Sequence, residues 1–231
     1  MTSIAANLQA VRARIAAACV AAGRSTDSVQ LLAVSKTWPA ASLREAAAAG
    51  QRAFGESYVQ EAAGKLVELA ELQLDWHFIG PLQSNKTRPV AENFAWVHSV
   101  DRLKVAERLA AQRPSELAPL QVCVQVNVSG EASKSGCAPD QAVALARAIG
   151  ALPGLRLRGL MAIPEPGEDI ARARQQFGML RTTLARINSE LALELDTLSM
   201  GMSEDLETAI MEGATIVRVG TAIFGQRDYT T

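Results

Sequence analysis

One lysine of this sequence follows directly after an apolar run. In LLAVSKT at 31–37, alternation along a strand places Leu32, Val34 and Lys36 on one face. If that face is buried, desolvation favours the neutral amine of Lys36, which can attack a carbonyl carbon and form a Schiff base. The alternative is a lysine that ends a strand and extends into solvent. The residue alone leaves both interpretations open.

Two pairs of glycine and hydroxyl residues point to an anion site. Ser203 ends the run SMGMS, and Gly220 with Thr221 ends the run IVRVGT. Backbone N–H groups at the start of a helix bind anions, and glycine allows the backbone to approach closely. The alternative for Ser203 is a helix cap with Glu204 and Asp205 in the first turn. Those carboxylates repel a phosphate unless they point away from it.

Arg218 is a permanent charge inside the apolar run IVRV at 216–219. Its structural explanation is an ion pair with a carboxylate on a covering helix. If Arg218 instead faces a ligand, its guanidinium can donate to a ring nitrogen and keep that nitrogen unprotonated. An amine for a carbonyl, an anion site and a donor to a ring nitrogen together describe one cofactor, pyridoxal 5'-phosphate.

The elements that must position these residues alternate in type along the chain. Short apolar runs predict strands at 29–37, 53–57, 76–80, 96–100, 120–128, 155–163, 197–201 and 215–220. Helical periodicity predicts helices at about 4–22, 40–49, 102–112, 140–149 and 170–193. Strands that are apolar on both faces and alternate with helices indicate a parallel sheet covered by helices.

The predicted fold class is α/β, a single (β/α)8 TIM barrel over residues 1–231 with an extra N-terminal helix. Eight strand–helix units suit this barrel, for which about 250 residues is typical. An open doubly wound sheet of about six strands is the alternative. In a barrel the active site lies at the carboxyl ends of the strands, which is where Lys36, Ser203, Arg218, Gly220 and Thr221 fall.

The composition excludes several classes of partner. With 48% hydrophobic residues and a formal net charge of −1, the 231-residue chain is expected to fold without general attraction for nucleic acid or acidic lipid. No apolar run approaches the roughly 20 residues that cross a bilayer, so no membrane association is expected. Arg12 and Arg14 interrupt the first apolar stretch, which therefore does not resemble a secretory signal.

The cysteines and histidines predict neither disulfides nor a metal site. Cys19, Cys123 and Cys137 are widely spaced, which is typical of a reducing compartment, and the cytoplasm is the simplest location. His77 and His98 fall on neighbouring predicted strands, and two ligands do not make a persuasive metal site. We predict that both are hydrogen-bonded strand residues.

Long motifs distributed over most of the chain carry a family resemblance. They are AVSKTWP at 33–39, FGESYVQE at 54–61, WHFIGPLQSNK at 76–86, GLMAIP at 159–164, LSMGMSEDLETAI at 198–210 and GATIVRVGTAIFG at 213–225, with a weaker match in NVSGEASKSG at 127–136. The sequence resembles the pyridoxal phosphate homeostasis proteins, a family related to the N-terminal barrel of alanine racemase. The resemblance implies a barrel of pyridoxal phosphate fold type III without the C-terminal β domain.

The resemblance also implies roles for individual residues. Lys36 matches the lysine that carries the cofactor as a Schiff base, and Arg218 matches the arginine at the pyridine nitrogen. Ser203, Gly220 and Thr221 match phosphate-binding positions. Ser57 departs from the family, which usually has asparagine after Gly-Glu, so the resemblance assigns no polar contact to the end of the second strand.

Two functions remain open at this point. The first, implied by the family, is a carrier that buffers pyridoxal phosphate or delivers it to apo-enzymes, affects amino-acid pools, and has no dedicated catalytic residue. The second is a small amino-acid racemase, which needs acid–base groups on both faces of the substrate. Neither Tyr58 nor Tyr229 is an obvious second base, and no further domain is expected to supply one. The carrier is the preferred hypothesis, and a monomer is expected.

Overall fold

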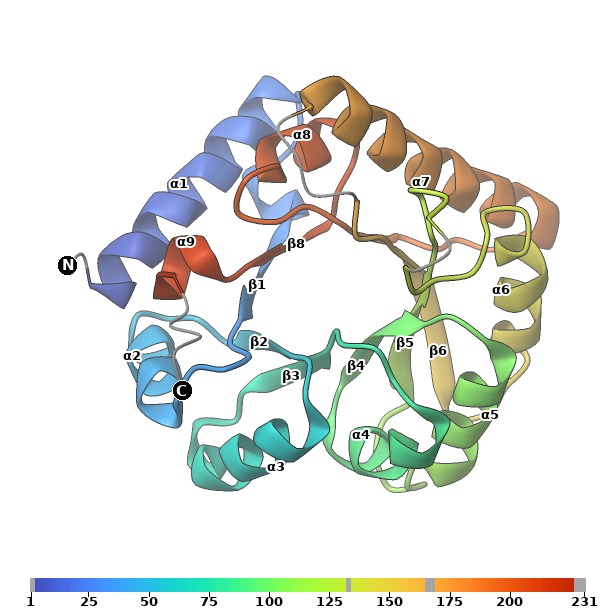
Figure 1. Ribbon diagram of the computed structural model, residues 1–231, viewed down its shortest axis with the longest axis horizontal. Helices are drawn as coiled ribbons and strands as arrows, with labels where there is room; N and C mark the ends of the chain where they lie inside the picture. Colours follow the sequence, from blue (N-terminus) through green and yellow to red (C-terminus); the bar gives the residue numbers. More distant parts are fainter. Residues whose placement is uncertain (1–2, 132–133, 165–168, 227–231) are drawn as a thin grey trace.

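Eight parallel strands close into a barrel in this computed structural model, which describes residues 3–131, 134–164 and 169–226. The strands follow their chain order around the barrel, and β1 pairs with β8 to close it. Figure 1 shows the helices forming a ring outside the strands. The predicted TIM barrel is therefore confirmed, and the open-sheet alternative is wrong because such a sheet leaves its two edge strands unpaired.

The strands agree in number and order with those predicted from the apolar runs. They are β1 (Gln30–Val34), β2 (Ala53–Glu56), β3 (Asp75–Phe78), β4 (Trp96–Val100), β5 (Leu120–Gln125), β6 (Leu155–Met161), β7 (Thr197–Ser199) and β8 (Ile216–Val219). Most end earlier than predicted at the carboxyl end, because there the chain turns outward toward the next helix and strand pairing stops. Lys36 consequently lies in a turn beyond β1 rather than in the strand.

The helices include the five that were predicted, whose bounds agree within two residues. They are α1 (Ile4–Ala21), α2 (Ala40–Ala48), α3 (Val59–Glu68), α4 (Thr87–Asn93), α5 (Leu103–Gln112), α6 (Ala142–Gly150), α7 (Ile170–Leu191), α8 (Leu206–Met211) and α9 (Thr221–Phe224). Short 3₁₀ turns are η1 (Thr26–Ser28), η2 (Ala70–Leu72) and η3 (Ser84–Lys86).

The core has two parts, as expected for a barrel. The larger part lies between strands and helices, and a smaller cluster fills the barrel interior with Leu32, Ala53, Trp96, Cys123, Met161 and Ile216. Since Leu32 and Ile216 face the interior, alternation along β1 and β8 predicts that Val34 and Arg218 face it too. Lys36 follows in the turn beyond β1, and it lines the same cavity as Arg218.

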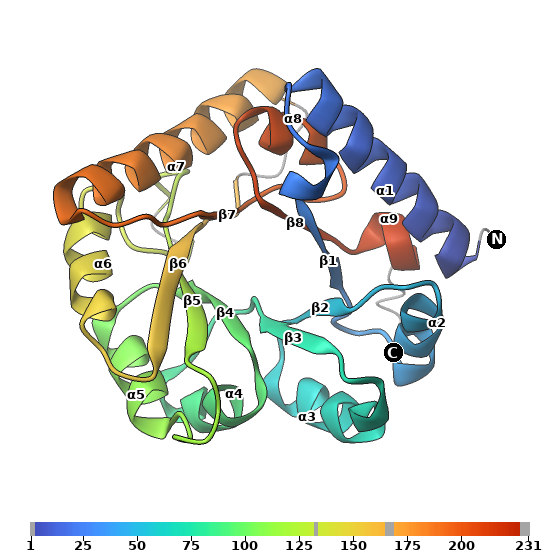
Figure 2. The same ribbon diagram turned by 180° about the vertical axis from the view of Figure 1, so that it is seen from behind.

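Helix α1 packs outside the barrel, against α2, α8 and α9 (Figures 1 and 2). By length and composition alone α1 is apolar enough to span a bilayer, which the apolar runs of the sequence did not predict. Its residues Leu8, Val11 and Ile15 are buried in the main core. The apolar face of α1 thus serves to cover the barrel.

Some expectations lie partly or wholly beyond the described residues. Tyr229 lies outside them, as do two residues of the motif at 127–136, 132 and 133. All three cysteines lie within the described chain and are free and buried, which confirms that none is half of a disulfide.

Candidate functional site

A cavity of about 290 Å³ lies at the carboxyl ends of the strands. Its lining includes every residue that was predicted to bind the cofactor: Lys36, Ser203, Arg218, Gly220 and Thr221. They come from the loops after β1, β7 and β8, from β8 itself and from the first residue of α9. Residues up to 185 positions apart therefore meet in one space, because parallel strands in a barrel end at the same face.

The turn that carries Lys36 has an unusual backbone. Thr37 has φ 71°, in the left-handed region that a β-branched residue rarely adopts. The Thr37 N–H donates to Glu61 Oε1 over 2.6 Å, which fixes the turn from outside the barrel. Lys36 itself is half-buried at the cavity wall. Lys36 thus lies beside the other predicted cofactor residues, as the functional interpretation requires.

A buried ion cluster lies behind this turn, between the barrel and α3. Lys65 Nζ donates to Glu56 Oε1 over 2.8 Å, to Glu61 Oε1 over 2.5 Å and to the Ser35 carbonyl oxygen over 2.8 Å. The Ser35 hydroxyl also donates to Glu56 Oε1, over 2.7 Å. Together these bonds clamp both neighbours of Lys36, Ser35 and Thr37, to β2 and α3.

Burial dominates the electrostatics of Glu56 in this cluster. It raises the pKa of the Glu56 carboxyl, while the charge and hydrogen bond of Lys65 act in the opposite direction. Lys65 shares its charge between two carboxylates, and Glu56 Oε2 has no hydrogen-bond partner. Sequence reasoning missed the cluster, although FGESYVQE contains both acids and Lys65 follows Glu61 at the i,i+4 spacing of helical ion pairs.

Arg218 is fully inside the barrel, with 4% of its surface exposed. Its Nη1 donates to Ser199 Oγ over 3.0 Å and its Nη2 to the Ala162 carbonyl oxygen over 2.9 Å. Both acceptors are neutral, so the ion pair with a helix carboxylate, which was the structural alternative, is not what holds Arg218. Burial lowers the pKa of Arg218 to about 10, opposed by the charge of Asp205, and the side chain stays protonated at neutral pH.

Ser203 joins the two loops that were predicted to bind phosphate. Its hydroxyl accepts a hydrogen bond from the Ala222 N–H on α9 over 3.3 Å. Helix α8 begins only at Leu206, so the interpretation of Ser203 as its cap is wrong. Instead the hydroxyl ties the loop after β7 to the helix after β8. Arg14 on α1 supports this loop by donating to the Ser203 carbonyl oxygen over 2.9 Å.

The two acidic residues beside Ser203 also line the cavity. The Asp205 carboxylate accepts from the Met202 N–H over 2.5 Å and acts electrostatically on Arg218. The negative charge of Asp205 is thus partly compensated by groups of the protein itself. Glu204 is exposed at the cavity rim. The acidic residues therefore belong to the same site as the predicted phosphate ligands.

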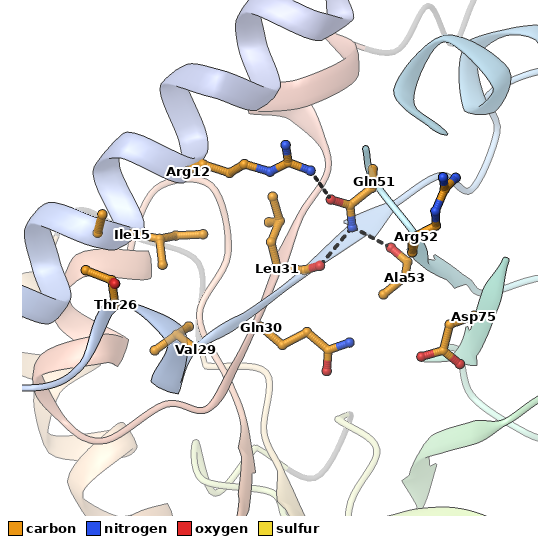
Figure 3. Close-up of a pocket in the computed structure, with 11 residues that line it drawn as sticks. Arg12, Ile15, Thr26, Val29, Gln30, Leu31, Gln51, Arg52, Ala53 and Asp75 are labelled. Atoms are coloured by element: carbon orange, nitrogen blue, oxygen red, sulfur yellow. Dashed lines mark hydrogen bonds between the residues drawn. The ribbon is translucent and has the colours of Figure 1, made fainter. Parts of the chain in front are cut away.

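A second pocket, of about 330 Å³, opens at the amino-terminal end of the barrel (Figure 3). Arg12 from α1 donates there to Gln51 Oε1, and the Gln51 amide donates to the carbonyl oxygens of Leu31 and Ala53. Asp75 lies at the edge of the same pocket. None of the residues that the sequence predicted to bind the cofactor lines this pocket.

The two histidines lie inside the barrel and are hydrogen-bonded to each other, which confirms the prediction made for them. Within the described part of the chain, no group of three or more His, Cys, Asp or Glu side chains is arranged to hold a metal ion.

Comparison with known proteins places this geometry in a family. The family described as "Alanine racemase, N-terminal domain" matches residues 3–228. A curated protein of Pseudomonas aeruginosa, "Pyridoxal phosphate homeostasis protein", is 65% identical over 229 residues, covering 99% of this chain and 98% of that protein. The chain belongs to the pyridoxal phosphate homeostasis protein family. The family resemblance and fold predicted from the sequence motifs are thereby confirmed.

Solved structures extend the likeness of this pyridoxal phosphate homeostasis protein family member. PipY of Synechococcus elongatus, described with pyridoxal phosphate bound, has a TM-score of 0.86 and 41% identity, covering 96% of this chain and 100% of that one. Alanine racemase of Corynebacterium glutamicum has a TM-score of 0.70 and 18% identity, covering 95% of this chain and 62% of the racemase. The racemase likeness shows the shared barrel fold only.

Proposed function

We propose that this protein carries pyridoxal 5'-phosphate as a Schiff base on Lys36 and serves in vitamin B6 homeostasis. The observation that carries the proposal is the cavity that brings Lys36, Arg218, Ser203, Gly220 and Thr221 together at the carboxyl ends of the strands. The donor set fits the cofactor: an amine for its aldehyde, a guanidinium for its ring nitrogen, and hydroxyl and backbone groups for its phosphate.

Each residue has a distinct part in this proposal. The Lys36 amine, once neutral, would bond to the aldehyde carbon of the cofactor, with the aldehyde oxygen and both amine protons leaving as water. Arg218 stays protonated and would donate to the ring nitrogen, which would keep that nitrogen unprotonated and make the ring a weak electron sink. Weak electron withdrawal suits storage of the cofactor better than carbanion chemistry on an amino acid.

The relatives support a role in cofactor supply. The curated relatives of Pseudomonas aeruginosa and Escherichia coli are both named pyridoxal phosphate homeostasis proteins, at 65% and 52% identity. We infer that this chain buffers pyridoxal phosphate in the cytoplasm or delivers it to apo-enzymes, and thereby affects amino-acid pools. Ser57, which lines the cavity where the family usually has asparagine, leaves the attachment at Lys36 unchanged in this proposal.

The attachment is tested by borohydride reduction of protein loaded with pyridoxal phosphate. Reduction should fix one covalent adduct, located at Lys36 by peptide mass spectrometry, and Lys36→Ala should abolish it. Lys86→Ala is the matched control, because Lys86 lines a neighbouring pocket of the barrel mouth. An adduct that persists at full yield in Lys36→Ala contradicts the attachment site.

A transfer assay distinguishes the carrier from the racemase alternative. Loaded protein is mixed with a pyridoxal-phosphate-free enzyme in the presence of a trap for free cofactor, and recovery of that enzyme's activity supports delivery. In parallel, the loaded protein is incubated with L- and D-amino acids. Robust racemisation that is lost in Lys36→Ala and in Tyr58→Phe overturns the carrier proposal. Tyr58 is the described tyrosine near the mouth, and 54% of its surface is exposed.

A further inference from the structure

A chain of four hydrogen bonds crosses the barrel interior behind Arg218. Arg218 Nη1 lies 3.0 Å from Ser199 Oγ, which lies 2.7 Å from His98 Nδ1. His98 Nε2 lies 2.9 Å from His77 Nδ1, and His77 Nε2 lies 3.0 Å from Asp75 Oδ2. The five side chains come from β8, β7, β4 and β3, so the chain connects opposite walls of the barrel.

The chemistry of Arg218 and Asp75 gives this series of hydrogen bonds one direction. Arg218 can only donate, and an ionised Asp75 can only accept. Donation to Asp75 requires a proton on His77 Nε2, so a neutral His77 accepts at Nδ1 from the proton on His98 Nε2. His98 Nδ1 then accepts from the Ser199 hydroxyl, whose oxygen accepts from Arg218. One proton arrangement therefore satisfies every bond with both imidazoles neutral.

The surroundings of the two histidines favour this arrangement. His77, His98 and Ser199 are fully buried. The Trp96 ring stacks on His77 with centroids 5.4 Å apart and an interplanar angle of 5°, which fixes the orientation of the imidazole. Burial, reinforced by the charge that a protonated His77 would carry and by the charge of Arg218, lowers the pKa of His98 well below its usual value, so His98 is neutral at physiological pH.

The series of hydrogen bonds from Arg218 to Asp75 ends at two different pockets. Arg218 lines the cavity at the carboxyl ends of the strands, whereas Asp75 lines the pocket at the amino-terminal end (Figure 3). The Asp75 side chain is 39% exposed, so its carboxylate is open to solvent. The barrel interior thus contains a hydrogen-bonded connection between the cofactor cavity and the opposite face of the molecule.

We propose that Ser199, His98, His77 and Asp75 act as one directional relay that positions Arg218 for its ligand. The relay makes Ser199 donate its own proton away from Arg218, which leaves the serine oxygen as the acceptor for Arg218 Nη1. A change at Asp75 is transmitted to Ser199 because each imidazole holds one proton. If the His77 proton moves from Nε2 to Nδ1, the His98 proton must also move from Nε2 to Nδ1. The choice of pyridoxal phosphate as the ligand in the test rests on the proposed function. The relay itself is a property of the protein without its ligand.

Histidine-selective ¹⁵N labelling tests the direction of the relay, because His77 and His98 are the only two histidines in the sequence. Long-range ¹H–¹⁵N correlation spectra at pH 7 distinguish the two tautomers and the doubly protonated ring. We expect both residues to carry the proton on Nε2 with Nδ1 unprotonated, in the unloaded protein and in the protein loaded with pyridoxal phosphate. A proton on Nδ1 of either ring overturns the proposal.

The transmission along the relay is tested by Asp75→Ala, with Gln30→Ala as the matched control from the same pocket. Without the carboxylate His77 loses its reason to prefer Nε2, and both histidines should shift to tautomer mixtures in equal proportion. Gln30→Ala should shift neither. A change at His77 without an equal change at His98 overturns the coupling.

The positioning of Arg218 is tested by Ser199→Ala. This variant leaves the buried guanidinium without its Nη1 acceptor, and pyridoxal phosphate should bind about tenfold more weakly. The control is Thr87→Val, which removes a buried hydroxyl that is bonded to Ser84 and Gln112 and is not part of the relay. Unchanged affinity in Ser199→Ala overturns the positioning role. If the wild-type protein fails to bind pyridoxal phosphate, the proposed function fails, while the tautomers of the unloaded protein still decide the relay.

Discussion

At the scale of single residues, burial controls the chemistry of the side chains inside this barrel. It keeps His98 neutral, lowers the pKa of Arg218 to about 10 and raises the pKa of Glu56. The same effect suppresses the thiolates, raising the pKa of Cys123 to about 12 and that of Cys137 to about 11. Charge in the interior is thereby restricted to groups that hydrogen bonds hold in place.

The cysteines provide a direct test of this effect. At pH 8 we expect iodoacetamide to leave Cys123 and Cys137 unmodified in the native protein and to modify both in urea, because the thiolate is the reactive form. Peptide mass spectrometry after timed labelling measures the difference. Rapid labelling of Cys123 in the folded protein would contradict the raised pKa.

The thiol pKa also has a consequence for stability. The folded pKa of Cys123, about 12, lies above the ordinary thiol value of 9.0, so the stability it contributes is full below about pH 9 and is lost as the pH rises toward 12. Comparison of Cys123→Ala with the wild-type protein by urea unfolding at pH 8 and pH 10 isolates this contribution. The stability difference between the two proteins should decrease at the higher pH.

At the scale of elements, the loops that carry the site are held by neighbouring helices. Helix α3 holds the Lys36 turn through Lys65 and Glu61, and α1 holds the loop after β7 through Arg14. The strands bring these loops to one face, and the helices fix their final positions. We therefore expect the helix packing to affect ligand binding, although no residue of α1 lines the cavity.

The Glu56 cluster is expected to make stability depend on pH. Because the pKa of Glu56 is raised, its contribution to stability is full below the ordinary carboxyl value of 4.5 and is lost as the pH rises through the folded pKa. Urea unfolding between pH 4 and pH 7 should show this loss in the wild-type protein and less of it in Glu56→Gln, which cannot ionise. Identical pH profiles for the two proteins would contradict the direction of the pKa change.

Arg14 is expected to affect ligand binding more than the free energy of unfolding. Its Nε donates to Glu207 over 2.7 Å and its Nη2 to the Ser203 carbonyl oxygen, and both side chains of the ion pair are partly exposed. Arg14→Ala should lower the free energy of unfolding by less than about 1 kcal/mol. It should still weaken pyridoxal phosphate binding severalfold, since the Ser203 loop loses its support.

The control for Arg14→Ala is Arg88→Ala, which breaks an exposed ion pair with Glu92 on α4. Titration of the visible absorbance with pyridoxal phosphate measures binding, and urea unfolding measures stability. Equal affinity in the two variants would show that α1 has no effect on the site.

At the scale of the whole molecule, the cavity spans the closure of the barrel. Its lining includes residues of β1 and of the segments after β1 and β2 at one end of the chain, and residues of β8 and of the segments after β7 and β8 at the other. A ligand in this cavity therefore contacts both sides of the pairing between β1 and β8. Binding to the folded state alone stabilises that state by mass action.

Bound pyridoxal phosphate should stabilise the folded barrel against unfolding. Pyridoxal phosphate at 100 times its dissociation constant should raise the free energy of unfolding by about 2.7 kcal/mol, and the melting temperature should rise with its concentration. Pyridoxal without the phosphate group is the control, and a smaller rise is expected because the Ser203 and Thr221 contacts are lost. Calorimetry with both ligands measures the difference. Equal stabilisation would contradict the phosphate assignment.

Much of the fold and of the candidate site was predictable because it depends on local patterns. Apolar runs alternating with helical stretches predicted the barrel, and residues placed after strands predicted that Lys36, Ser203 and Thr221 would meet. Strand ends were less predictable, since pairing stops where the chain turns outward rather than where apolar residues stop. Lys36 lies in a turn for that reason.

The sequence by itself determined the strand order, the inward face of β1 and the set of residues that meet at the mouth of the barrel. Only the tertiary structure decided the Lys65 cluster and the relay from Arg218 to Asp75. Their bonds join residues as distant as His98 and Ser199, which are 101 positions apart. Such pairs depend on how far the closed strands are staggered, and therefore on which side chains face each other across the barrel interior. No periodicity within one strand contains that information.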